Sequence, residues 1–151
     1  MSENRNNMGS EIRTATLNVT SEAVWSYFER PQSWPQWDPD IVAVSANTEV
    51  GIVEGRTWNI ELEAPKKAKL EFSNVTLGTK FTWRVIALGG AMQGVGQFRL
   101  EPINGGDQTR FEYEFEMKGV LGSPIWLAAR KKIVRGVDGG MDNILAEFGS
   151  R

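Results

Sequence analysis

Residues 110–117 alternate between charged and apolar side chains, and this alternation constrains the fold more than any other stretch of the chain. From Phe111 to Met117, every second residue is apolar or aromatic, and Arg110 and three glutamates occupy the positions between them. Successive side chains of a β-strand point to opposite faces. The segment is therefore predicted to be a strand with one apolar and one solvent-facing side, in a sheet that needs a cover.

The segment from Ser123 to Phe148 has the pattern of a long amphipathic helix. Ser123 and Pro124 suit the N-cap and the first helical position. Apolar residues then recur at three- and four-residue steps, namely Trp126, Ala129, Ile133, Val137, Met141, Ile144 and Phe148. We expect this helix to cover the apolar face of the sheet, and the interior between them to be either a filled core or a pocket.

Period-two patterns and turn residues predict seven strands, over residues 11–19, 41–46, 56–63, 67–75, 79–88, 91–101 and 110–117. Two short helices are expected between the first two strands, one capped by Thr20 and one around Trp34 and Trp37, which are expected to clamp these helices onto the sheet. The predicted fold class is α+β, a strongly curved antiparallel sheet wrapped around the C-terminal helix. Residues 11–149 are expected to form a single domain after a disordered tail over residues 1–10.

The composition excludes several classes of function. The chain has no cysteine and no histidine, which rules out disulfides, thiol nucleophiles, imidazole metal ligands and Ser-His-Asp hydrolysis. A net charge of −2 gives no reason to expect a nucleic-acid partner. No run of about 18 apolar residues is present, and the polar start does not match a secretory signal, so we expect a cytoplasmic protein without integral membrane association.

The candidate ligand-binding residues are the aromatic side chains expected on the inner face of the sheet, together with two residues of the helical stripe. They are Trp58, Phe72, Phe81, Trp83, Phe98, Phe111, Tyr113, Phe115, Ile133 and Val137. Each residue taken alone fits core packing better than ligand binding. Taken together, a curved sheet with a single covering helix encloses more volume than side chains easily fill, which favours a pocket.

Polar groups on the predicted inner face are scarce. Tyr113 is the inward residue that has both an apolar body and a hydroxyl, which suits it to orienting a ligand oxygen or to forming a core hydrogen bond. Glu61 is expected to face solvent, and only a reversed register would bury it as a general base. Asp38 and Asp40 have no neighbouring residues in the sequence that would complete a metal site, and no metal or other cofactor is expected.

Glycines occur inside two of the predicted elements. Gly94 and Gly96 lie on the inner face of a strand, where glycine marks a bend or a close backbone approach. Three more glycines lie within the long helix, where each costs about 1 kcal/mol relative to alanine. They indicate either a kink or clearance for a ligand or portal; the positions are Gly136, Gly139 and Gly140.

The element order resembles the SRPBCC superfamily, the START-related helix-grip proteins, and its polyketide cyclase/dehydrase-like branch. The resemblance rests on Ser21-Glu22-Ala23-Val24-Trp25, on Trp34-x-x-Trp37-x-Pro39 and on the turn from Gly51 to Gly55. It implies a bent sheet that grips the C-terminal helix around a hydrophobic cavity. It also implies ligand binding and, in some branches, cyclisation or dehydration of a polyketide. The superfamily has no shared catalytic motif, so the resemblance assigns no catalytic residue.

Three functional hypotheses follow. The first is binding of a hydrophobic or aromatic small molecule, such as a lipid, between the sheet and the helix. The second is a cyclase/dehydratase-type enzyme, for which Tyr113 and Glu61 are the nominees. The third is an interaction module resembling chaperone-ATPase activators, indicated only by a basic cluster that otherwise suits a solvated helix face, formed by Arg130, Lys131, Lys132 and Arg135. The sequence sets neither the ligand nor the oligomeric state.

Overall fold

The computed structural model describes residues 10–119 and 122–149, with only the backbone described for residues 122–126. Its elements are β1 (Ser10–Leu17), α2 (Ser21–Glu29), η1 (Pro31–Ser33), α3 (Trp34–Trp37), β2 (Ile41–Val44), β3 (Thr57–Leu62), β4 (Lys67–Thr76), β5 (Lys80–Ala87), η2 (Leu88–Gly90), β6 (Met92–Ile103), η3 (Asn104–Gly106), β7 (Gln108–Lys118) and α4 (Gly122–Phe148). β1 begins at Ser10, one residue earlier than predicted, and the rest of the predicted tail lies outside the described residues.

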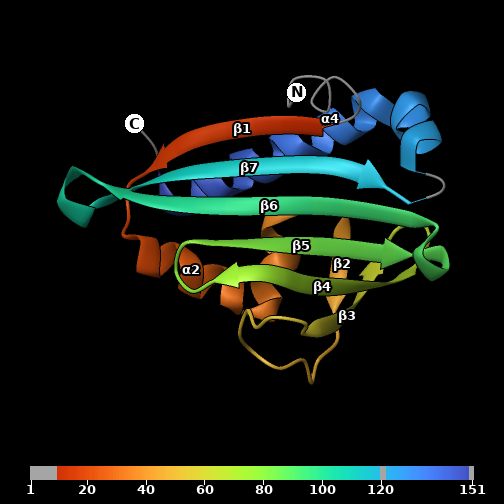
Figure 1. Cartoon of the computed structure of the whole chain (residues 1–151), viewed down its shortest axis with the longest axis horizontal. Helices are drawn as coiled ribbons and strands as arrows, with labels where there is room; N and C mark the ends of the chain where they lie inside the picture. Colours follow the sequence, from red (N-terminus) through yellow and green to blue (C-terminus); the bar gives the residue numbers. More distant parts are fainter. Residues whose placement is uncertain (1–9, 120–121, 150–151) are drawn as a thin grey trace.

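Seven antiparallel strands form one curved sheet in the order β1-β7-β6-β5-β4-β3-β2. The helices lie behind this sheet in Figure 1, where α4 runs along β1 and β7. The predicted helix-grip fold is therefore confirmed, with the two short helices between β1 and β2 as expected. No helix among the described residues is long and apolar enough to cross a membrane.

The predicted register is confirmed on both β7 and β3. Phe111 and Tyr113 of β7 are buried on the inner face, and they lie opposite Leu100 and Phe98 of β6. On β3, Trp58 and Ile60 are buried while Glu61 is exposed. A buried general base at Glu61 is therefore wrong for this chain, because the pleat directs its carboxylate to the outer face.

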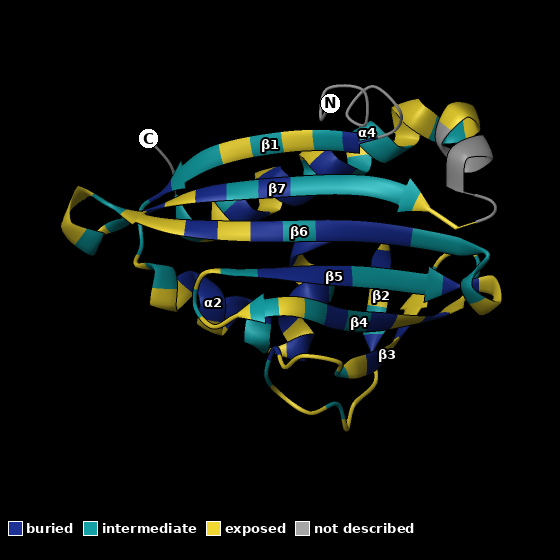
Figure 2. Ribbon diagram, viewed as in Figure 1, coloured by how far each residue is buried: buried dark blue, intermediate teal, exposed yellow. Residues whose placement is uncertain are grey.

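The short helices fill one end of the curved sheet with aromatic rings. Phe28 of α2 and Trp34 and Trp37 of α3 have no solvent exposure, and the indole nitrogen of Trp34 donates a hydrogen bond of 2.8 Å to the carbonyl oxygen of Phe28. The Trp34 ring meets rings from four strands at centroid distances of 5.8 to 6.4 Å, namely Trp58, Phe72, Phe81 and Phe98. Figure 2 shows that the strands facing these helices are buried over part of their length, in β5 and β6 above all. The clamping role predicted for the two tryptophans is confirmed.

Helix α4 packs closely against α3 and the loop after it. A Cβ added to Gly140 would lie 3.2 Å from the Trp37 ring, and one added to Gly139 would lie 3.3 Å from Pro39. The side chain of Asn143 donates a hydrogen bond of 3.0 Å to the carbonyl oxygen of Trp37. The helical glycines therefore provide clearance for protein backbone and side chains.

The irregular point of α4 is not at these glycines. It lies at Ala129, whose φ of −123° and ψ of 20° depart from helical geometry. A kink at the glycines, one of the two explanations predicted for them, is therefore wrong. The helix is regular at the glycines, where it packs against Trp37 of α3 and the loop after it.

The glycines of β6 make room for rings of the neighbouring strands. A Cβ at Gly96 would lie only 2.1 Å from the indole of Trp83, and one at Gly94 would lie 3.0 Å from the ring of Phe115. Trp83 is 1% exposed and is packed from several sides, whereas Phe115 is half-buried. The close approach predicted from glycine in this strand is therefore present. The approaching groups are aromatic side chains, which pack directly over the glycine backbone.

Replacing Gly96 with alanine is expected to lower the free energy of unfolding by about 3 kcal/mol, because the new methyl group overlaps a buried ring that cannot move aside. Urea unfolding measures this loss. The matched comparison is the same substitution in a Trp83→Ala background, where the overlap is gone and the added cost should fall below about 1 kcal/mol. An equal cost in both backgrounds would mean that Trp83 is not the obstacle.

Candidate functional site

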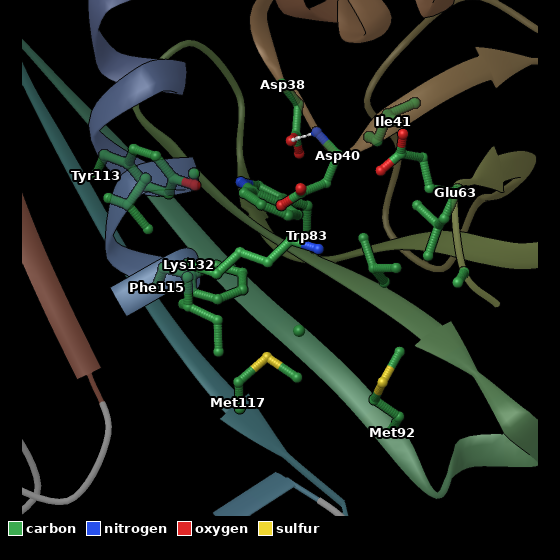
Figure 3. A pocket seen from close by; sticks show the side chains of 17 residues that line it. Asp38, Asp40, Ile41, Glu63, Trp83, Met92, Tyr113, Phe115, Met117 and Lys132 are labelled. Carbon is green, nitrogen blue, oxygen red and sulfur yellow. Dashed lines mark hydrogen bonds between the residues drawn. The ribbon is translucent and has the colours of Figure 1, made fainter. Parts of the chain in front are cut away.

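A cavity of about 280 Å³ lies between the inner face of the sheet and α4. It is at the opposite end of the strands from the buried rings of Phe28, Trp34 and Trp37, which we call the aromatic plug. The apolar walls of the cavity come from β2, β3, β5, β6, β7 and α4, and include Val85, Met92, Met117 and Ile133. Its polar groups come from the loop after α3, the end of β3, β7 and α4; they are Asp38, Asp40, Glu63, Tyr113 and Lys132. Figure 3 shows these side chains converging on one space.

The structure divides the ten predicted site residues into two equal groups. Five line the cavity: Trp83, Tyr113, Phe115, Ile133 and Val137. The other five pack in the aromatic core around the short helices and do not reach the cavity walls: Trp58, Phe72, Phe81, Phe98 and Phe111. All ten share the apolar interior, but the rings of α2 and α3 occupy the space in front of the second group.

Asp38 is the buried carboxyl group of the cavity. Its residue is 7% exposed, and one carboxyl oxygen accepts a hydrogen bond of 2.9 Å from the backbone N–H of Asp40. Burial raises the pKa of Asp38 from an ordinary 3.8 to about 7, and the charge of Asp40 adds to the rise, while the hydrogen bond opposes it. Asp38 therefore exchanges its proton near neutral pH, as a group suited to acid–base work does.

Tyr113 presents its hydroxyl to the same space. The residue is 3% exposed, and its oxygen points toward the centre of the cavity in Figure 3. None of the described residues forms a hydrogen bond with this hydroxyl. Burial raises the pKa of Tyr113 well above its usual value, and the nearby charges of Asp38 and Asp40 raise it further. The hydroxyl therefore stays protonated and is available to a bound molecule as donor and acceptor.

Asp40, Glu63 and Lys132 form the exposed rim of the cavity. The Asp40 carboxylate lies against α4, where a Cβ on Gly136 would be 3.2 Å from its oxygen. The pKa of Asp40 is raised, first by partial loss of solvent; Lys132 opposes this rise and Glu63 adds to it. Lys132, predicted as part of a solvated helix face, instead borders the cavity, whereas Arg130, Lys131 and Arg135 do not line it.

The sequence interpretation missed the three acidic residues of the site. Asp38 and Asp40 were considered only as metal ligands, and Glu63 was not considered. The available signal was the Asp38-Pro39-Asp40 turn directly after two buried tryptophans, because a turn tied to a buried helix is drawn toward the interior. Among the described residues, no group of three acidic side chains is arranged to hold a metal ion.

A family profile decides the relationship of this chain to known proteins. Residues 12–149 match the profile described as polyketide cyclase / dehydrase and lipid transport. The chain belongs to this family. No curated protein matches the chain, so the family assignment rests on the profile.

Solved structures of low sequence identity share the fold of this polyketide cyclase-like family member. A START superfamily protein from Mycobacterium smegmatis is 12% identical, with a TM-score of 0.63, over 92% of this chain and 98% of that one. A hypothetical protein from Helicobacter pylori is 12% identical, with a TM-score of 0.71, over 94% and 86% of the two chains. A conserved protein from Geobacillus kaustophilus is 19% identical, with a TM-score of 0.63, over 91% and 93%.

Proposed function

We propose that this protein binds a hydrophobic or aromatic small molecule in the cavity between the sheet and α4. The observation that carries the proposal is the cavity of about 280 Å³ with largely apolar walls beside an otherwise densely packed aromatic core. Apolar concave sites with a few convergent polar groups are the usual ligand sites of proteins. Trp83, Phe115 and Ile133 supply the apolar contact, and Tyr113 orients a polar atom of the ligand.

Membership of the family adds support, because its description includes lipid transport. The fold places α4 over the apolar face, and the rim residues Asp40, Glu63 and Lys132 keep the mouth polar. A cavity with an apolar body and a polar mouth suits a molecule that is carried through water. The location of the protein in the cytoplasm remains a prediction from the sequence.

Filling the cavity tests this proposal. Val85 lies opposite Gly94, and both residues line the cavity, so Val85→Phe places a ring in space that a ligand would occupy. Titration with the apolar fluorophore N-phenylnaphthylamine is expected to show saturable binding to the wild-type protein and affinity about 10-fold lower for Val85→Phe, a loss of about 1.4 kcal/mol.

The matched control is Val42→Phe, because Val42 is 54% exposed and does not line the cavity. This variant should bind the fluorophore as the wild-type protein does. Equal affinities for all three proteins would place the binding elsewhere, and the absence of saturable binding would argue against an apolar ligand site.

One observation favours a second candidate, an acid–base enzyme of the cyclase/dehydratase type. The buried Asp38 and the protonated Tyr113 hydroxyl share one cavity, and burial places the pKa of Asp38 near 7. Such a pair is able to remove a proton from a bound substrate and to hydrogen-bond the oxygen on which charge develops. Mass spectrometry of a ligand recovered after incubation with the protein distinguishes turnover from simple binding.

A further inference from the structure

The charged groups around the cavity are predominantly acidic. Asp38, Asp40 and Glu63 contribute three carboxyl groups, and Lys132 contributes the one cationic group among the described lining residues. With all four ionised, the lining has a net charge of −2, three negative and one positive. The cavity therefore favours a positively charged polar group on its ligand over a negatively charged one.

The one other cation that acts on a group of the cavity among the described residues, Arg13, does not reverse this balance. Arg13 of β1 acts on the charge state of Tyr113, but its guanidinium is held by two acidic side chains. It lies 3.0 Å from the carboxylate of Glu11 and 2.7 Å from that of Asp138. Its charge is therefore already neutralised locally.

The most buried charged group of the cavity is the carboxyl group of Asp38. Asp38 is 7% exposed, and only one of its carboxyl oxygens receives a hydrogen bond from the described residues, from the backbone of Asp40. Tyr113, which lines the same cavity, is 3% exposed, and its hydroxyl has no protein partner among these residues. Lys132 is exposed at the rim, where water screens its charge. The electrostatic energy of an ion bound deep in the cavity therefore depends mainly on the charge of Asp38.

The walls next to these oxygens are aromatic. The ring centroid of Trp83 lies 6.1 Å from that of Tyr113 and 5.9 Å from that of Phe115. Aromatic faces attract cations through the negative charge above and below the ring. A buried carboxylate flanked by aromatic rings is the combination of groups that recognises an ammonium ion.

We propose that the cavity selects an apolar ligand that carries a protonated amine. The ammonium donates hydrogen bonds to the free carboxyl oxygen of Asp38 and to the hydroxyl oxygen of Tyr113, and the apolar body packs on Trp83 and Phe115. A carboxylate ligand of the same shape meets Asp38 and Asp40 as like charges and is disfavoured. This inference rests on the proposed function, because it concerns the chemistry of the same cavity.

Three ligands that share one ring system but differ in their polar group test amine selectivity separately from apolar binding itself. Calorimetric titration at pH 8 compares naphthylmethylamine, naphthylmethanol and naphthoate. We expect the amine to bind about 10-fold more tightly than the alcohol, as a charge-assisted hydrogen bond adds, and the carboxylate to bind most weakly. Equal affinities would leave the proposed function standing and overturn the inference. No binding by any of the three would count against both.

Two variants assign the selectivity to named groups. Asp38→Asn keeps the shape and the acceptor for the Asp40 N–H, and it should reduce the ratio of amine to alcohol affinity to about threefold or less. Tyr113→Phe should lower the amine affinity about fivefold. The control is Asp142→Asn, an exposed position of α4 that does not line the cavity and should leave the ratio unchanged. An unchanged ratio in Asp38→Asn would overturn the inference.

A pH series on the wild-type protein tests the same point without any substitution. The amine stays protonated from pH 5 to pH 8, whereas Asp38 loses its proton near pH 7 in the surroundings formed by Asp40, Glu63, Lys132 and Tyr113. The amine affinity should therefore rise about 10-fold across this range while the alcohol affinity changes little. An amine affinity that is flat or falls with pH would contradict a carboxylate as its partner.

Discussion

Trp34→Ala is expected to lower the free energy of unfolding by about 5 kcal/mol, the upper end of the range for removing a buried aromatic side chain. Trp34 is fully buried, and its ring contacts rings from α2, α3 and four strands of the sheet, β3 to β6. The substitution leaves a cavity at the centre of the aromatic plug, and it also removes the donor to the Phe28 carbonyl. Urea unfolding monitored by far-UV circular dichroism measures the loss.

Trp34→Phe separates these two contributions. Phenylalanine fills most of the space but leaves the carbonyl oxygen of Phe28 without its 2.8 Å hydrogen bond, which is expected to cost about 2 kcal/mol together with the lost volume. A domain of this size has a total stability on the order of 10 kcal/mol, so the alanine variant should remain folded but become sensitive to mild denaturant. A loss below about 2 kcal/mol for alanine would show that the plug is not the main core.

Asp38→Asn is expected to make the protein about 4 kcal/mol more stable than the wild type at pH 8 and equally stable at pH 4. Burial raises the pKa of Asp38 from 3.8 to about 7, roughly three units at 1.36 kcal/mol each. The folded state therefore holds a proton more tightly than the unfolded state. Stability from this group is complete below pH 4, declines as the pH rises toward 7, and is lost above it.

Urea unfolding from pH 4 to pH 8 measures the free energy of unfolding of both proteins. Taking the difference between the two values cancels the contribution of the other carboxyl groups, because both proteins contain them. The asparagine oxygen still accepts the hydrogen bond from the Asp40 N–H, so the comparison isolates the buried charge. Asp142→Asn, at an exposed position of α4, serves as the control and should follow the wild-type profile. Parallel pH profiles for wild type and Asp38→Asn would mean that water reaches the Asp38 carboxylate freely.

The fold was predictable because its signals are local. Strict alternation at Phe111 and Tyr113 assigns each side chain to a face, and the same reasoning placed Trp58 inside and Glu61 outside. Turn residues and helix periodicity delimited the elements to within a few positions at most boundaries. These patterns depend on neighbours along the chain, so a single sequence is sufficient to read them.

The division of the interior into plug and cavity was not predictable in this way. Phe98 and Phe115 both face inward, and nothing in their own strands distinguishes the core residue from the cavity residue. The distinction comes from Phe28, Trp34 and Trp37, which occupy one end of the sheet from a distant part of the chain. A local pattern assigns a side chain to a face but does not locate what packs against it.

The same reason explains why Asp38 was missed. An acidic residue next to proline after a helix ordinarily belongs to a solvated turn. Its burial here follows from the approach of α4, which meets the Trp37–Asp40 segment through Gly136, Gly139 and Gly140 more than 90 residues later in the chain. The glycines themselves were recognised in the sequence, but the segment that they accommodate was not.

The glycine contact of α4 also limits how this protein can be stabilised. Exchanging helical glycine for alanine is a standard route to greater thermal stability, worth about 1 kcal/mol per position. An added methyl group would lie 3.2 Å from the buried Trp37 ring at Gly140 and 3.2 Å from the Asp40 carboxylate at Gly136, on either side of the turn that holds Asp38. The helical glycines that alanine would ordinarily stabilise are therefore the same residues that pack against the Trp37–Asp40 segment beside the cavity. Stabilising substitutions in α4 should be sought at other positions of the helix.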